Sequence, residues 1–136
     1  MTDTTTPGTH IEAELASQPS CWAEAVAAGR RHVGALPAPG ERVAVVGCGT
    51  SLYVARAYSA LREASGAGET DAFAASEYRD GRRYNRVVAI SRSGTTTEIL
   101  DVLARIASRD EPPTIVAITA DGATPIAALA DDVVEL

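Results

Sequence analysis

The residues best suited to chemistry form a run of hydroxyl side chains around one glycine, Ser91-Arg92-Ser93-Gly94-Thr95-Thr96-Thr97-Glu98. The run leads into a helical pattern, so several hydroxyl and backbone N–H donors fall within one turn. Donors grouped in this way at a helix N-terminus bind a phosphate dianion. The spacing of Thr95 and Glu98 also fits a capping box, which would only close the helix end. That alternative does not account for the two serines and the glycine together.

A second loop of this kind is Gly47-Cys48-Gly49-Thr50-Ser51, which follows a short apolar run and opens another helical pattern. Its glycines allow a tight turn and a close approach to a ligand, and its hydroxyls lie at a helix start. A tight turn with a Thr or Ser cap and no ligand is the alternative. A dinucleotide-binding fingerprint is incomplete, because Leu52 stands where a third glycine or an alanine is required.

Three further features could take part in chemistry. Glu77 at the end of a predicted strand could face a sugar or act as a base, but a Ser-Glu pair also starts ordinary helices. Cys48 is interpreted as a small buried filler. A cluster of arginines could meet an anion or another subunit, or form a solvated loop; its members are Arg79, Arg82, Arg83 and Arg86.

The periodicity of apolar residues predicts the elements that position these loops. Residues 1–10 are interpreted as a mobile arm, residues 11–17 and 20–36 as helices separated at Pro19, and residues up to 40 as a linker. Strands are expected over 42–46, 71–75, 87–90, 114–119 and 132–136, and helices over 51–64 and 98–108, the first of these with Leu52, Ala55, Tyr58 and Leu61 on one face. Apolar strands alternating with amphipathic helices predict an α/β fold with a five-stranded parallel sheet covered on both faces. Ligands of such sheets bind at the carboxyl ends of the strands.

Composition excludes several functions. The 136 residues include twelve Lys+Arg, all of them arginine, which removes Schiff-base chemistry and the lysine of a P-loop. A net charge of -6 makes a nucleic-acid partner unexpected. His10 and His32 have no partner at metal-ligand spacing, so neither a metal site nor a cofactor is predicted. Two cysteines and the lack of a long apolar run favour a cytoplasmic protein with no membrane partner.

Together the two loops resemble the sugar isomerase, or SIS, domain. The similarity is greatest to the first isomerase domain of glucosamine-6-phosphate synthase and to sugar-phosphate deaminases and deglycases. Residues 75–79 and 10–19 also look like that group, and the four segments occur in the same order. The resemblance covers residues 10–136 and implies that residues 41–136 are the first of two such domains, with the second outside this sequence.

The resemblance also implies roles for individual residues. Ser91, Ser93 and Thr96 look like the residues that hold the phosphate of a sugar phosphate, with a further contact from the backbone at Arg92. Thr50 and Ser51 look like those that close over the phosphate and the sugar. The full set implied for phosphosugar binding is Gly49, Thr50, Ser51, Ser91, Arg92, Ser93, Gly94 and Thr96.

The resemblance says least about the catalytic groups. In two-domain relatives the enolisation base and ring-opening groups come from beyond this domain or from a partner subunit, which leaves Glu77 as a weak candidate. Single-domain phosphoheptose isomerases are less similar, because Leu61 stands where they carry a glutamate. The expectation is a cytoplasmic, homodimeric phosphosugar-binding domain of carbohydrate metabolism, within an isomerase or an amino-sugar-phosphate deaminase. A non-catalytic phosphosugar sensor is the alternative, and the sugar itself is not specified.

Overall fold

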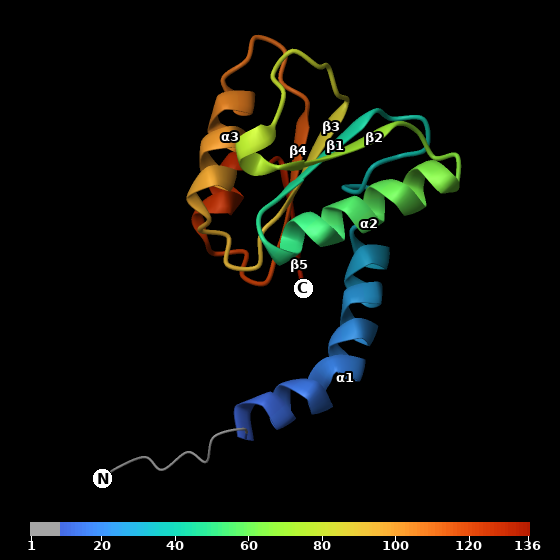
Figure 1. The fold of residues 1–136 in the computed structure, drawn as a ribbon, viewed down its shortest axis with the longest axis vertical. Helices are drawn as coiled ribbons and strands as arrows, with labels where there is room; N and C mark the ends of the chain where they lie inside the picture. The colour runs from blue at the N-terminus through green and yellow to red at the C-terminus, as the bar shows by residue number, and fades with distance from the viewer. Residues whose placement is uncertain (1–8) are drawn as a thin grey trace.

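The computed structural model describes residues 9–136, which form a five-stranded sheet with helices around it (Figure 1). The predicted α/β class with an all-parallel sheet is confirmed. The strands are Val43–Gly47 (β1), Thr70–Ala74 (β2), Arg86–Ile90 (β3), Thr114–Thr119 (β4) and Asp132–Glu135 (β5). The helices are Thr9–Arg31 (α1), Thr50–Ala64 (α2) and Thr97–Ala107 (α3), with 3-10 turns at Ala75–Glu77 (η1) and Pro125–Leu129 (η2).

The strand order β2-β1-β3-β4-β5 places β1 beside β3. Gly47, the last residue of β1, pairs with Ile90, the last residue of β3. The two hydroxyl-bearing loops that follow these residues therefore leave the sheet side by side at its carboxyl edge.

Opposite faces of the sheet are covered by different helices, with α2 on one side and α3 on the other (Figure 1). Side chains alternate between the faces with period two. Val43 and Val45 of β1 therefore pack with Ala55 of α2, while Ala44 and Val46 pack on the α3 side. The α3 contribution to the larger of these two core clusters is the predicted apolar stripe, Ile99, Val102, Leu103 and Ile106.

Near the C-terminal end of α2, the buried residue is not the one that the helical spacing predicts. Leu61 is 72% exposed, whereas its neighbour Arg62 is 6% exposed. The Arg62 guanidinium donates to the carbonyl oxygens of Glu41 and Ala38 and to the Thr70 hydroxyl, at 3.0, 2.7 and 2.9 Å. Because these bonds hold the linker before β1 against β2, a charged residue takes the inward position and the leucine turns outward.

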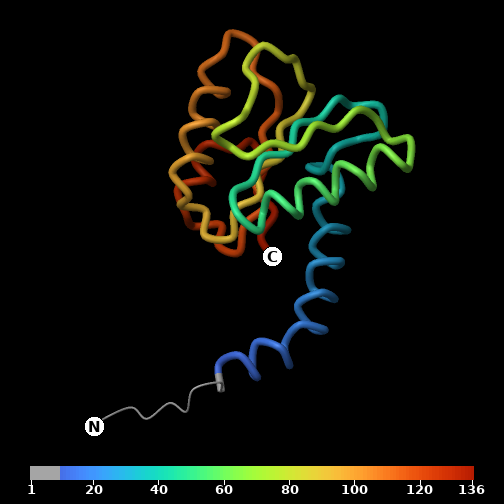
Figure 2. The backbone as a smooth tube through the Cα atoms, in the orientation of Figure 1, coloured from blue at the N-terminus to red at the C-terminus, as the bar shows by residue number. Residues whose placement is uncertain are grey.

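The N-terminal segment is one helix and not two. Helix α1 runs through Pro19 without ending, so the predicted break there is wrong. A proline inside a helix removes one backbone hydrogen bond and bends the helix, but does not have to end it. The trace of α1 is visibly bent (Figure 2). Thr9 and His10, expected in a mobile arm, are its first residues, and the rest of that arm, residues 1–8, lies outside the described residues.

Candidate phosphate-binding site

Two helix N-termini without side-chain caps define the candidate site. Gly49 at the N-cap of α2 and Thr96 at the N-cap of α3 make no side-chain cap hydrogen bond. The first backbone N–H groups of a helix have no partner within it, and the helix dipole places partial positive charge there. Figure 1 shows both helix starts at the sheet edge where the chain ends. At α2 the Ser51 and Leu52 N–H groups donate to the carbonyl oxygens of Cys48 and Gly49, both at 3.1 Å. Within the described residues, the N–H groups of Thr50, Thr97 and Glu98 have no hydrogen-bond partner.

Hydroxyl groups of the loop after β3 are arranged around the start of α3. The Ser93 Oγ accepts hydrogen bonds from the Thr95 hydroxyl at 3.1 Å and the Thr95 backbone N–H at 3.3 Å. A serine hydroxyl that accepts in this way keeps its own proton to donate. Ser93 is exposed, so that proton is available to a ligand.

Ser91 fixes the inner side of the same loop. Its side chain is 3% exposed, and its Oγ accepts the backbone N–H of Gly94 at 3.2 Å and lies 3.3 Å from the Thr96 Oγ1. The loop is also tied to β4, since the Ala120 backbone N–H donates to the Arg92 carbonyl oxygen at 3.1 Å. The structure thus brings together the residues predicted to hold phosphate on a supported backbone.

Position 94 requires glycine for two reasons, its backbone conformation and the lack of room for a Cβ atom. Its φ is +62°, in the left-handed region that favours glycine. A Cβ there would overlap the Thr124 hydroxyl and approach the Ile126 side chain, because the Ile126 N–H donates to the Gly94 carbonyl oxygen at 3.1 Å. The loop after β3 is therefore packed directly against the segment that leads into η2.

The capping-box alternative does not match the helix start. That motif needs Thr95 at the N-cap and Glu98 three residues later. Helix α3 has Thr96 at its N-cap, so Glu98 falls one position too early for the motif. The Ile99 N–H donates to the Thr96 carbonyl oxygen at 3.1 Å, which leaves the N–H groups of Thr97 and Glu98 for another acceptor.

In the loop after β1 the two glycines have different roles. A Cβ on Gly47 would lie 2.6 Å from the carbonyl carbon of Ser51, so β1 and the first turn of α2 can approach only with glycine there. Gly49 adopts a φ of +54° in open space, so backbone conformation alone favours glycine. Thr50 is exposed and Ser51 half-buried at the start of α2.

The two remaining candidates differ in their position. Glu77 is exposed at the end of η1, directly after β2, and thus also lies at the carboxyl edge. Cys48 is half-buried and packs against the core cluster on the α3 side. This packing matches the interpretation of Cys48 as a small filler.

The sequence analysis missed the contribution of the loop after β4. Thr119 ends that strand, is 2% exposed, and its Oγ1 donates to the Arg92 carbonyl oxygen at 3.3 Å. The Thr124 hydroxyl donates to the Asp121 carbonyl oxygen at 2.7 Å and so sits over Gly94. A signal was present, since a hydroxyl at a strand end followed by Asp121-Gly122 marks a turn at the same sheet edge.

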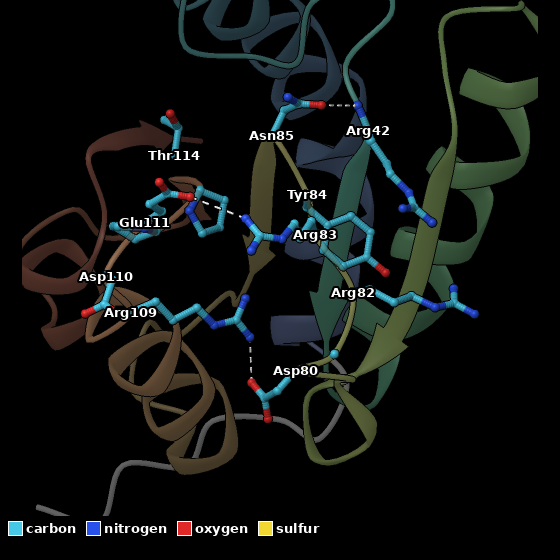
Figure 3. Close-up of a pocket in the computed structure, with 13 residues that line it drawn as sticks. Arg42, Asp80, Arg82, Arg83, Tyr84, Asn85, Arg109, Asp110, Glu111 and Thr114 are labelled. Carbon is cyan, nitrogen blue, oxygen red and sulfur yellow. Dashed lines mark hydrogen bonds and ion pairs between the residues drawn. The ribbon is translucent and has the colours of Figure 1, made fainter.

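Two members of the arginine cluster, Arg82 and Arg83, line an open pocket of about 1080 Å³ at the opposite, amino-terminal edge of the sheet (Figure 3). A third, Arg86, begins β3 at the same edge. These three arginines are paired with acids: Arg82 with Asp71 at 2.7 Å, Arg83 with Glu111 at 3.3 Å and Arg86 with Glu41 at 3.0 Å.

One further carboxylate and one tyrosine at this edge also have their polar atoms paired. Asp80 accepts from Arg105 at 3.0 Å and from Arg109 at 2.6 Å. Burial acts to raise the pKa of Asp80, but these hydrogen bonds outweigh it and the pKa is lowered. Burial, together with the hydrogen bond to Asp71, raises the pKa of Tyr84 to about 12. Each of the four arginines that line the pocket thus lies within 3.3 Å of a carboxylate oxygen.

No group of three or more His, Cys, Asp or Glu side chains is placed to hold a metal ion in residues 9–136. Over the same range, none of the helices has the length and apolar character needed to cross a membrane.

The chain belongs to the SIS domain family, whose model matches residues 38–136. The match begins at the linker and includes both loops of the candidate site. The resemblance inferred from those loops is therefore confirmed. Among curated proteins, none matches the sequence significantly.

Solved structures of similar fold support this assignment. The C-terminal domain of glucosamine-fructose-6-phosphate aminotransferase from Francisella tularensis superposes with a TM-score of 0.79 at 18% identity, over 99% of this chain and 41% of that one. The glucosamine-6-phosphate deaminase from Thermotoga maritima gives 0.62 at 26% identity, over 82% and 36%. The NanR protein of Vibrio vulnificus, complexed with ManNAc-6P, gives 0.66 at 18%, over 98% and 53%. The chain spans about half or less of each of these proteins.

Proposed function

We propose that the chain binds a phosphorylated sugar at the carboxyl edge of its sheet, with the phosphate held by the loop after β3. The observation that carries this proposal is the pair of uncapped N-termini of α2 and α3, which open at adjacent strand ends beside exposed hydroxyls. An anion with several oxygens satisfies more of these donors than a single carboxylate does. NanR, with the same fold, was solved with a sugar phosphate.

Within this proposal the site residues have distinct roles. Ser93 and Thr96 donate their hydroxyl protons to phosphate oxygens, together with the free N–H groups at the start of α3. Ser91, whose side chain is buried, holds the Gly94 backbone in place and adds its hydroxyl from below. Thr50 and Ser51 close the site from the α2 side.

The reaction proposed for the complete protein is proton transfer beside a carbonyl, in an aldose–ketose isomerase or an amino-sugar-phosphate deaminase. Such a step needs one base to move the proton and donors to stabilise the enediolate oxygen. Glu77 is the carboxylate that the sequence predicts at this edge, and its side chain is exposed. The principal base is proposed to come from a second domain or a partner subunit, in a cytoplasmic homodimer.

A thermal-shift titration of the chain with fructose-6-phosphate, glucosamine-6-phosphate, ManNAc-6P, inorganic phosphate, NAD and ATP tests the binding proposal. A ligand at 100 times its dissociation constant adds about 2.7 kcal/mol of stability. We expect a hexose phosphate to stabilise the chain and Ser93→Ala to remove the shift. Ser108→Ala at the other end of α3 is the matched control and should respond like the parent.

Two outcomes would overturn this assignment. One is stabilisation by nucleotides alone, and the other is a Ser93→Ala response equal to that of the parent. If binding is confirmed, an isomerase and ammonia-release assay with the bound sugar separates an enzyme from a phosphosugar sensor. Turnover supports the enzyme, whereas tight binding without turnover by the complete protein supports the sensor.

A further inference from the structure

The loop after β3 carries an arginine whose charge has no partner in the described part of the fold. Arg92 is exposed, and within residues 9–136 its side chain forms no ion pair. Other arginines are paired with carboxylates: Arg42, Arg82, Arg83, Arg86, Arg105 and Arg109. Among the exposed arginines that lack such a partner in this range, Arg92 alone lies between two residues of the candidate site, Ser91 and Ser93.

The backbone of Arg92 is held in place, so its side chain starts from a fixed point beside the site. Its carbonyl oxygen accepts the Ala120 N–H at 3.1 Å and the Thr119 hydroxyl at 3.3 Å. The preceding Ser91 N–H donates to the Ile118 carbonyl oxygen at 3.0 Å. Helix α3 begins a few residues later, and a cation is unfavourable near the positive end of a helix dipole. The fold itself gains nothing from a cation here, which indicates that the partner of Arg92 is an anion on a ligand.

The phosphate of the proposed ligand does not need this guanidinium. A phosphate ester has three terminal oxygens, which together accept about six hydrogen bonds. The neutral donors of the candidate site already reach that number. They are the hydroxyl groups of Thr50, Ser51, Ser93 and Thr96 and the N–H groups of Thr50, Thr97 and Glu98. Arg92 therefore remains available to an anionic group other than this phosphate.

We propose that Arg92 binds a second anionic group of the ligand, a carboxylate or a further phosphate on the same sugar. The planar guanidinium pairs with either group through two parallel N–H···O bonds. Two anionic groups on one molecule repel each other, so they require separate binding groups, which the hydroxyl donors and Arg92 supply. This inference rests on the proposed function, because it concerns the same site. It narrows the ligand class to sugar phosphates that carry a second anionic group.

Isothermal titration calorimetry with two matched pairs of sugars tests this assignment. Fructose-1,6-bisphosphate adds a phosphate to fructose-6-phosphate, and 6-phosphogluconate has a carboxylate in place of the aldehyde of glucose-6-phosphate. We expect the parent to bind the doubly anionic member of at least one pair about tenfold more tightly, as a charge-assisted hydrogen bond provides. The pair that shows the preference identifies the second group as phosphate or carboxylate. Arg92→Gln should remove the preference and leave the affinity for fructose-6-phosphate within about twofold.

Two further variants separate the role of Arg92 from that of charge in general. Arg31→Gln is the matched control, because it removes the same charge from an exposed position in the last turn of α1 and should keep the preference. Arg92→Lys keeps the charge without the planar guanidinium and should retain only part of the preference. Equal affinities within both pairs for the parent, an equal loss for both members in Arg92→Gln, or loss of the preference in Arg31→Gln overturns the proposal. If no sugar phosphate binds the parent, the proposed function fails as well, so the two failures are distinguishable.

Discussion

The two edges of the sheet are built on different principles. At the amino-terminal edge, arginines and carboxylates line a hollow of about 1080 Å³ and pair with one another, as Arg83 does with Glu111. At the carboxyl edge, serines and threonines hold a narrow turn in place and leave helix N-termini uncapped. The first edge has satisfied its charges within the fold, while the second has donors that remain free.

This contrast shows which features identify a binding site. A group of charges is not a recognition surface once each charge has a partner, since further pairing would have to break existing contacts. Donors without partners are informative because leaving such groups unsatisfied costs free energy that a ligand can recover. The carboxyl edge is therefore the functional candidate, although the open pocket of about 1080 Å³ lies at the amino-terminal edge.

The largest expected effect is at Gly94. Gly94→Ala places a Cβ at φ +62° against the Thr124 hydroxyl, and we expect a loss of about 3 kcal/mol in the free energy of unfolding, together with loss of sugar-phosphate binding. Gly40→Ala is the control at the other edge, where φ is +85° but the space is open. Its expected loss is about 1 kcal/mol without effect on binding. Urea denaturation and thermal shift measure both, and equal losses would show that crowding at Gly94 is unimportant.

A smaller, pH-dependent effect is expected at Glu41. Its carboxylate accepts two hydrogen bonds from Arg86, at 3.0 and 3.2 Å, and these lower its pKa. A carboxylate with a lowered folded-state pKa stabilises the fold above its unfolded pKa, and this contribution is lost as pH falls through the folded value. Glu41→Gln should cost about 1 kcal/mol at pH 7 and flatten the fall in stability below about pH 4.5.

Urea denaturation between neutral pH and pH 3 measures this effect. Glu111→Gln is the control, because its ion pair with Arg83 is 84% exposed on the glutamate side. An unchanged pH profile for Glu41→Gln would show that the Arg86 pair contributes nothing. Sugar-phosphate binding at pH 7 should be the same in both variants.

The smallest effect is expected at Asp80, whose side chain is half exposed. Asp80→Asn should change the free energy of unfolding by less than about 1 kcal/mol, with a smaller change at high salt because exposed ion pairs are screened. Denaturation at two salt concentrations provides the measurement. A loss of sugar-phosphate binding in this variant would contradict the separation between the two edges.

The sheet, and the position of the hydroxyl-rich loop after β3, were predictable because their signals are local. Runs of β-branched residues such as Arg86–Ile90 are read directly, and the hydroxyl-glycine run after that strand needs only the rule that strand ends meet at one edge. The predicted strands agree with the structure to within one residue at each end. The pairing of the loops then follows from the register between Gly47 and Ile90.

Features that depend on distant partners were not predictable. The helical spacing predicted Leu61 on the buried face of α2. Arg62 is buried instead, because its guanidinium donates to carbonyl oxygens of the linker. The Thr124 side chain packs against Gly94, thirty positions earlier in the chain, and no short-range sequence pattern links these two residues. Pro19 was interpreted as a break or a first helical turn because proline disfavours a helix interior, yet α1 continues through it.

The position of Trp22 has a consequence for spectroscopy. It is the sole tryptophan of the chain and lies on the exposed part of α1, while Tyr78 and Tyr84 are buried beside Phe73 on the sheet. Indole fluorescence therefore reports on the projecting helix, and the tyrosine bands of near-ultraviolet circular dichroism report on the sheet. Helix α1 and the sheet therefore give separate spectroscopic signals, and the unfolding of one can be followed independently of the unfolding of the other.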